Sequence, residues 1–126
     1  MRQNIQSGGP FEDSYGYCRA VRVGNTVHVA GTCAQDPNID GCDTYQQAVS
    51  ALAIIEDALT QAGASMADVV RTVTYVTDVG DVDQVSRAHK EAFDAVRPAS
   101  TLVGVAALID PRLTVEIEAY AIIDEG

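Results

Sequence analysis

The stretch VVRTVTYVTD, residues 69–78, has the clearest conformational preference in this chain of 126 residues. Most of its side chains are β-branched, and such side chains suit a pleated strand better than a helix because rotation about χ1 is already restricted. Both faces of the predicted strand carry apolar members, in two alternating sets: Thr72, Thr74 and Val76, and Arg71, Val73 and Tyr75. Neither face is therefore marked as solvated, and we expect both to be covered.

One helical pattern precedes this strand and another follows it. The first has apolar side chains at helical spacing at Tyr45, Val49, Leu52, Ile55, Leu59 and Ala62. Asp43 with Gln46 resembles a capping box, and Gly63 stands where a helix usually ends. The second pattern comprises Val82, Val85, His89, Ala92 and Val96. We expect Asp81 to accept hydrogen bonds from its first-turn N–H groups, and Arg97-Pro98 to close it.

Four more strands are predicted outside this central part. Residues 17–23 and 26–30 are valine-rich and flank Gly24-Asn25, the pattern of a hairpin with a two-residue turn. Residues 101–108 and 113–123 give the last two strands. The order ββαβαββ predicts a single α+β domain over residues 1–126, a mixed sheet with two helices on one face. The other face is then available as a subunit interface.

Composition and charge narrow the function classes. Hydrophobic residues make up 47% of the chain and charged residues 21%, which is typical of a folded globular protein. The formal net charge of -10 would repel a phosphate backbone, so the sequence disfavours nucleic-acid binding. No signal peptide or apolar stretch long enough to span a bilayer is evident, so we expect a soluble, cytoplasmic protein.

Segments in a fixed order resemble the RidA/YjgF family across nearly the whole chain. They are Gly16-Tyr17, Arg19-Ala20-Val21, Val29-Ala30-Gly31, Ala62-Gly63-Ala64, Asp68–Thr72, Arg97–Thr101 and Val115–Ala119. The last two, RPAST and VEIEA, are the most specific. The resemblance implies a chorismate-mutase-like fold, a homotrimer whose sheets line a central β-barrel, and ligand clefts between neighbouring subunits. It also implies hydrolysis of reactive enamines and imines to a keto acid and ammonia, with no cofactor or metal.

The resemblance assigns cleft roles to individual residues. Glu116 corresponds to the family glutamate thought to position or activate the attacking water, and Tyr17 to the cleft tyrosine. Gly31 corresponds to a glycine whose backbone approaches the ligand. We expect Thr32 to border the cleft beside it, and Thr101 supplies the hydroxyl that closes the P-A-x-[ST] pattern.

Two positions depart from the family pattern: Ala30 replaces a more usual serine, and Ser100 stands where active deaminases have an arginine. A guanidinium holds a substrate carboxylate through a bidentate, charge-assisted pair, whereas serine offers one neutral hydrogen bond. Arg97 or Arg19 could replace the missing cation, or the substrate could lack a carboxylate. Alternatively, Arg97 only ends its helix and Arg19 only pairs with a surface carboxylate.

Other chemically capable side chains have simpler interpretations. Glu118 shares a strand face with Glu116, but is also consistent with an ordinary polar face. His89 fits a packing position on its helix, and His28 a polar strand face. Neither histidine has a partner at metal-ligand spacing. Cys33 could be a reactive thiol if positive charge lowers its pKa, although a small half-buried residue is the plainer interpretation.

The sequence and the family resemblance thus favour a hydrolytic deaminase of a small imine, enamine or related reactive metabolite, weak or inactive on 2-iminobutanoate. A non-catalytic ligand-binding or regulatory trimer is the alternative, and a ribonuclease is disfavoured by the acidic charge and the lack of a basic patch.

Overall fold

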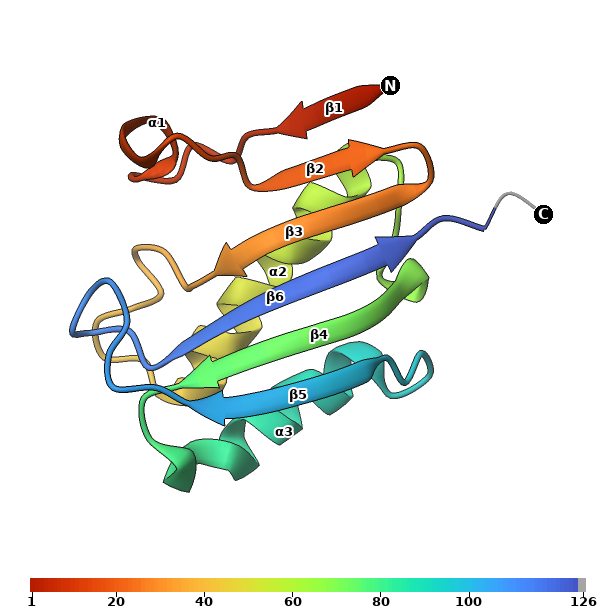
Figure 1. Cartoon of the computed structure of the whole chain (residues 1–126). Helices are drawn as coiled ribbons and strands as arrows, with labels where there is room; N and C mark the ends of the chain where they lie inside the picture. Colours follow the sequence, from red (N-terminus) through yellow and green to blue (C-terminus); the bar gives the residue numbers. More distant parts are fainter. Residues whose placement is uncertain (125–126) are drawn as a thin grey trace.

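The computed structural model describes residues 1–124 and contains one six-stranded mixed sheet with its long helices on one face (Figure 1). Residues 125 and 126, part of the domain expected from the sequence, lie outside the described residues. The elements in chain order are β1 (Arg2–Ile5), α1 (Glu12–Tyr15), β2 (Ala20–Val23), β3 (Thr26–Thr32), α2 (Thr44–Gln61), η1 (Met66–Asp68), β4 (Val69–Val76), η2 (Val79–Asp81), α3 (Val82–Phe93), β5 (Ala99–Gly104) and β6 (Val115–Ile122). The predicted α+β class is confirmed.

The last strand of the chain lies in the middle of the sheet. The spatial order is β1-β2-β3-β6-β4-β5, so β6 separates the N-terminal hairpin from β4, and β1 and β5 form the two edges. Every neighbouring pair is antiparallel except β4 and β5, which are parallel and joined through α3. The hairpin turn at Gly24-Asn25 is confirmed, because Val23 pairs with Thr26.

Strand alternation divides the sheet into a covered face and an open face. The covered face packs against α2 and α3 and includes Thr72, Thr74, Val76, Val115, Ile117, Ala119 and Ala121, all buried. The open face carries the partly or fully exposed Arg71, Val73, Tyr75, Glu116, Glu118 and Tyr120. Figure 1 shows both long helices on one side of the sheet. Each face of β4 thus carries the set that its alternation predicted.

The helices supply the other half of the core. Helix α2 buries Ala48, Ala51, Leu52, Ile55 and Leu59 against the sheet, and α3 adds Val85, Ala88 and Phe93. Both hydrogen bonds of the predicted capping box between Asp43 and Gln46 are present at the start of α2. Gly63 follows its end with φ of +84°, a conformation that glycine adopts without strain.

Several sequence expectations need correction. The strand predicted over residues 101–108 spans Ala99–Gly104, and the strand predicted over residues 17–23 begins at Ala20. Residues 2–5 form an additional edge strand, which the sequence did not indicate because only Ile5 among them is buried. Helix α3 ends at Phe93, not at Val96, because Arg97 turns into the left-handed region at φ 57°. Asp81 makes no side-chain cap for α3. Its carboxylate instead accepts hydrogen bonds from Thr44 and Gln84 and so links the two helices.

Within residues 1–124, none of the helices is both long and apolar enough to cross a membrane.

Replacing Asp43 with alanine should destabilise the protein by about 1 kcal/mol, because the N3 backbone N–H of α2 would lose its acceptor. Urea unfolding monitored by circular dichroism measures the change. Glu56→Ala, a substitution on the exposed surface of the same helix, is the matched control and should change stability by less than about 0.5 kcal/mol. Equal losses in the two variants would contradict the capping role.

Candidate functional site

A buried arginine organises the N-terminal side of the site. Arg19 is 4% exposed and lies between α1 and β2. Its Nη1 donates to the Gly31 carbonyl at 2.8 Å and to the Thr32 hydroxyl at 3.1 Å, and its Nη2 donates to the Tyr17 hydroxyl at 2.8 Å. Its Nε reaches the Ser7 hydroxyl at 3.3 Å. The guanidinium therefore fixes two predicted cleft residues, Tyr17 and Gly31.

Glu12 balances the charge of Arg19. The two side chains are both buried, with 3.8 Å between Nη2 and Oε2. Glu12 also accepts from the Ser7 hydroxyl at 2.5 Å and from the backbone N–H groups of Ser7 and Gly9. Burial raises the pKa of Glu12, but the hydrogen bonds from Ser7 and Gly9 and the charge of Arg19 outweigh it and hold the pKa below its usual value.

Glu116 approaches this cluster from β6. A Cβ atom added at Gly31 would lie 2.8 Å from the Glu116 carboxylate, so the close approach requires glycine there. The Cys33 thiol donates to Oε1 of Glu116 at 3.6 Å. The structure thus brings Glu116, Tyr17, Gly31, Arg19 and Cys33 together, although they come from different parts of the chain.

These residues line a cavity of about 410 Å³. Glu116, Tyr17, Arg19 and Cys33 share it with an apolar wall formed by Phe11, Ile39, Ile109 and Leu113. A space of this size, lined by a carboxylate, a phenol and several apolar side chains, suits a small organic molecule.

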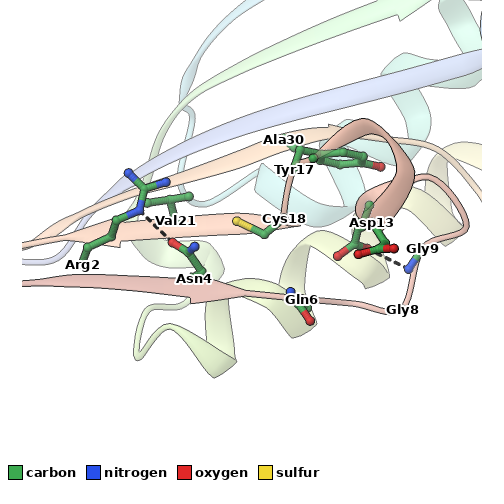
Figure 2. A pocket seen from close by; sticks show the side chains of 12 residues that line it. Arg2, Asn4, Gln6, Gly8, Gly9, Asp13, Tyr17, Cys18, Val21 and Ala30 are labelled. Atoms are coloured by element: carbon green, nitrogen blue, oxygen red, sulfur yellow. Dashed lines mark hydrogen bonds between the residues drawn. The ribbon is translucent and has the colours of Figure 1, made fainter.

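Tyr17 also borders a second hollow of about 640 Å³ beside the N-terminal strand. Figure 2 shows Tyr17 and Ala30 on one side of this hollow and Asn4 and Gln6 of the N-terminal segment on another. Cys18 lies between them. This hollow is larger but does not contain Glu116, so the smaller cavity is the better candidate for chemistry.

The surroundings of Cys33 do not favour a reactive thiol. Burial and the neighbouring carboxylate of Glu116 raise the pKa of Cys33 to about 12, although the charge of Arg19 acts in the opposite direction. The thiol is therefore protonated at neutral pH and acts as a hydrogen-bond donor to Glu116. Cys18, Cys33 and Cys42 are all free cysteines.

Thr32 does not line the cavity as expected. Its side chain is 1% exposed, and its hydroxyl accepts from Arg19 and donates to the Ala30 carbonyl at 2.7 Å. Because side chains alternate along β3, Thr32 points toward the core, whereas its neighbour Gly31 lies against the Glu116 carboxylate. Thr32 therefore supports Arg19 rather than a ligand.

The remaining predicted residues lie at the other edge of the sheet, on β5 and just before it. Ser100 and Thr101 are exposed and point to opposite faces, because Ser100 pairs with Thr72 and Thr101 with Val73. Thr101 accepts from Arg71 on the open face at 3.2 Å. Ser100 faces the helix layer and borders a separate cavity beside α3. A single chain therefore does not bring Ser100 and Thr101 together with Glu116.

Neither predicted substitute for the missing arginine is free. Arg19 is buried and bonded to four polar groups, and its carboxylate partner, Glu12, is a buried rather than a surface residue. Arg97 donates to the backbone carbonyl of Asp94 at 2.8 Å and to its carboxylate at 2.5 Å. This geometry matches the interpretation of Arg97 as a residue that ends its helix.

Sequence reasoning missed a third guanidinium. Arg112 lines the cavity of Glu116, but it pairs with Asp36, Asp40 and Asp110 at 3.5, 3.1 and 2.8 Å. Its hydrogen bonds to Asp110 hold the pKa of that carboxyl below its usual value. The spacing of these residues in the sequence gives no signal of the cluster. Three carboxylates around one cation leave little attraction for an anionic ligand.

Glu118 points to the open face with Glu116 but has a different environment. Its two carboxylate oxygens accept from the hydroxyls of Tyr75 and Tyr120. The hydrogen bond to Glu118, together with burial, raises the pKa of Tyr75 to about 12. His28 packs edge-on against Tyr120. Within residues 1–124, no three His, Cys, Asp or Glu side chains lie together in a metal-binding arrangement.

Comparison with known proteins identifies the family. The family model described as "Endoribonuclease L-PSP" matches residues 11–123. The crystal structure of Rv2704 from Mycobacterium tuberculosis, described as a member of the YjgF/YER057c/UK114 family, is 48% identical with a TM-score of 0.91 and covers 98% of this chain and 100% of its own. The chain belongs to the RidA/YjgF family. Its fold is therefore the YjgF-like fold that the sequence predicted.

Other members of the RidA/YjgF family are similar over most of their length. The protein SCO2049 from Streptomyces coelicolor is 43% identical over 94% of this chain and 91% of its own length. The human 2-iminobutanoate/2-iminopropanoate deaminase is 32% identical over 84% of this chain and 79% of its own. Family members with a deaminase name thus exist at moderate identity.

Replacing Glu12 with glutamine should lower stability at pH 7 by roughly 2 kcal/mol, because the buried Arg19 would lose its ionic partner. The folded-state pKa of Glu12 lies below its unfolded value, so the stabilisation is complete above the unfolded pKa of about 4.3 and is lost as the pH falls through the folded pKa. Urea unfolding at pH 7 and pH 3 should show the gap between wild type and variant narrowing at pH 3. A gap independent of pH would contradict the ionic role.

Proposed function

We propose that this RidA/YjgF protein is a hydrolytic deaminase of a small imine or enamine, converting C=N to C=O with release of ammonia. The observation that supports this most is the position of Glu116, whose carboxylate borders a small cavity beside Tyr17 and is approached closely by Gly31. The names of related proteins, such as the human 2-iminobutanoate/2-iminopropanoate deaminase, support the same reaction class.

The side chains suggest how the reaction proceeds. A carboxylate at Glu116 accepts a proton from water, and the water oxygen adds to the imine carbon. The nitrogen takes up protons and leaves as ammonia, and the carbon keeps the oxygen as a carbonyl. Arg19 donates to the Tyr17 oxygen, so the Tyr17 O–H remains available to donate to the reacting nitrogen or oxygen. Cys33 donates to Glu116 and helps to hold its carboxylate in place.

We also propose that three chains assemble with their open faces inward, as the family resemblance implies. The open face carries Val73, Tyr75 and Tyr120, which are only partly exposed in one chain. Such an assembly would place the β5 edge of one subunit near the Glu116 cavity of its neighbour. The separation of Ser100 and Thr101 from Glu116 within one chain fits a cleft completed between subunits.

The substrate preference should differ from that of arginine-bearing relatives. Ser100 offers a neutral hydroxyl in place of a guanidinium, and Arg19, Arg97 and Arg112 are already paired. A charge-assisted hydrogen bond contributes on the order of 1.5 to 3 kcal/mol, so its loss corresponds to roughly 10- to 100-fold weaker transition-state binding of a carboxylated imine.

A ribonuclease is the less favoured function, although the family model carries that description. The net charge is -10. His28 lies on β3 beside Tyr120 of the open face, and His89 lies on α3 beside Thr72 of the covered face. Within one chain the sheet separates the two imidazoles, so they do not form an acid and base pair on one phosphate.

Glu116→Gln should lower ammonia release from freshly generated imines at least about 100-fold, because the amide cannot accept the proton of the attacking water. Glu118→Gln is the matched control, since it makes the same change on the same strand and face. It should retain activity if its assembly size, checked by light scattering, is unchanged. If wild type and Glu116→Gln release ammonia equally from every imine tested, the enzymatic proposal fails. If the wild-type protein binds these ligands without turning them over, it is a binding trimer and not an enzyme.

Ser100→Arg should raise kcat/KM for 2-iminobutanoate by roughly 10- to 100-fold, because a guanidinium can pair with the substrate carboxylate. Ser100→Gln, which adds length without charge, is the control and should give no such gain. Stopped-flow assays with an imine that lacks a carboxylate should show no improvement for either variant. Rapid wild-type turnover of 2-iminobutanoate would contradict the proposed preference.

A further inference from the structure

A second cavity, apart from that of Glu116, lies between α3 and β5. It has a volume of about 460 Å³. Its polar residues include Ser100 and His89, and Phe93 and Leu102 contribute apolar surface. Of the sheet residues that line it, Ser100 is exposed and Thr74 is buried.

Three side chains form a hydrogen-bonded chain from the sheet to this cavity. The Thr72 hydroxyl lies 2.8 Å from Nε2 of His89 and 2.8 Å from the Ser100 hydroxyl. Thr72 is fully buried, so these two neighbours satisfy a hydroxyl that water cannot reach. A hydroxyl carries one proton, and Thr72 can donate to only one of the two. His89 and Ser100 are therefore coupled through Thr72, and Ser100 is held in a defined orientation.

The hydrogen-bonded network of Thr72, His89 and Ser100 is uncharged at neutral pH. Burial lowers the pKa of His89, so its imidazole is neutral, and its ring packs against Phe93 with 4.8 Å between centroids. Among the charged residues around the cavity, Arg97 is bonded to Asp94, and Lys90 is exposed on the surface of α3. The polar group that reaches the cavity from the sheet is thus a hydroxyl supported by neutral partners.

We propose that Ser100, oriented by Thr72 and His89, binds an uncharged polar group of the ligand, such as a carboxamide or a hydroxyl. Thr72 and His89 are positioning residues that act through Ser100. The inference rests on the proposed function for the ligand class, an imine or its carbonyl product, and specifies which substituent that ligand carries. The Thr72–His89–Ser100 network itself offers no cation to a carboxylate, and of the cations that line the cavity Arg97 is paired with Asp94 and Lys90 is exposed. A carboxamide, in contrast, both donates to and accepts from a hydroxyl.

Butanamide and butanoate test the proposal because they differ only in the terminal group. Each is titrated into the full-length protein at pH 7 and followed by NMR. Butanamide should bind about three- to tenfold more tightly than butanoate, as expected for one neutral hydrogen bond, and should shift the signals of Ser100 and His89. Equal or tighter binding of butanoate would overturn the proposal. If Lys90→Gln then abolished the binding of butanoate, the cavity would be assigned to an anionic ligand. No saturable shift at Ser100 with either probe would also overturn it.

Two substitutions at Thr72 separate positioning from structural support. Thr72→Val keeps the shape but removes the hydroxyl, and should bring the two affinities to within about twofold of each other. Thr72→Ser restores the hydroxyl and should restore the preference. His89→Gln, which keeps a polar partner for Thr72, should retain more of the preference than His89→Leu.

The readout is a ratio of affinities in the folded protein, so a modest loss of stability does not change it. Thr74→Val measures the stability cost of removing a buried hydroxyl from the same face of β4. If Thr72→Val has the same ratio of butanamide to butanoate affinity as Thr72→Ser and wild type, the hydrogen-bonded network of Thr72, His89 and Ser100 has only a structural role. The affinity ratio is measured without turnover. An unfavourable ratio therefore does not affect the ammonia-release test of the deaminase proposal, and a lack of ammonia release does not affect the ratio.

Discussion

The buried guanidinium of Arg19 is the interaction on which the Glu116 site depends. It donates to groups before β2 and at the end of β3, and its charge is balanced by Glu12 from α1. An unpaired charge at 4% exposure would be strongly destabilising, so the segment that carries Glu12 must dock for the sheet to be stable. Arg19, held by that segment, also donates to the Tyr17 hydroxyl and to the Gly31 carbonyl. Folding and preorganisation of the cavity therefore have the same cause.

The sheet order explains why the candidate residues fall into two groups. Insertion of β6 between β3 and β4 places Glu116 next to the N-terminal hairpin, while the parallel pairing of β4 and β5 carries Ser100 to the opposite edge. Alternation then separates Ser100 from its neighbour Thr101, which faces Arg71 on the open side. A site that uses both groups needs two chains, and that requirement links catalysis to assembly.

Periodicity predicted the elements that bury one face, and local chemistry predicted some of their boundaries. The alternation of β4 and the capping box of Asp43 are examples, since each follows from residues close in the sequence. The edge strand β1 was not predictable, because its polar residues pair through the backbone. The role of Asp81 was not predictable either, because its partner Thr44 is distant in the sequence. The partners of Arg19 are closer in the sequence, but no periodic pattern or motif relates them to it. The family resemblance supplied Glu116 but not the pairing of Arg112.

The side chains around Ser100 suit a hydroxyl group at this position and not only the loss of an arginine. Thr72 is fully buried and needs hydrogen-bond partners, and Ser100 and His89 supply them on either side. A guanidinium has only donors and could not accept a hydrogen bond from Thr72, whereas a serine can donate or accept. The neutral imidazole completes the chain without adding charge. The three residues are thus mutually consistent, and this local consistency favours a ligand that is recognised by hydrogen bonding over one that is recognised by charge.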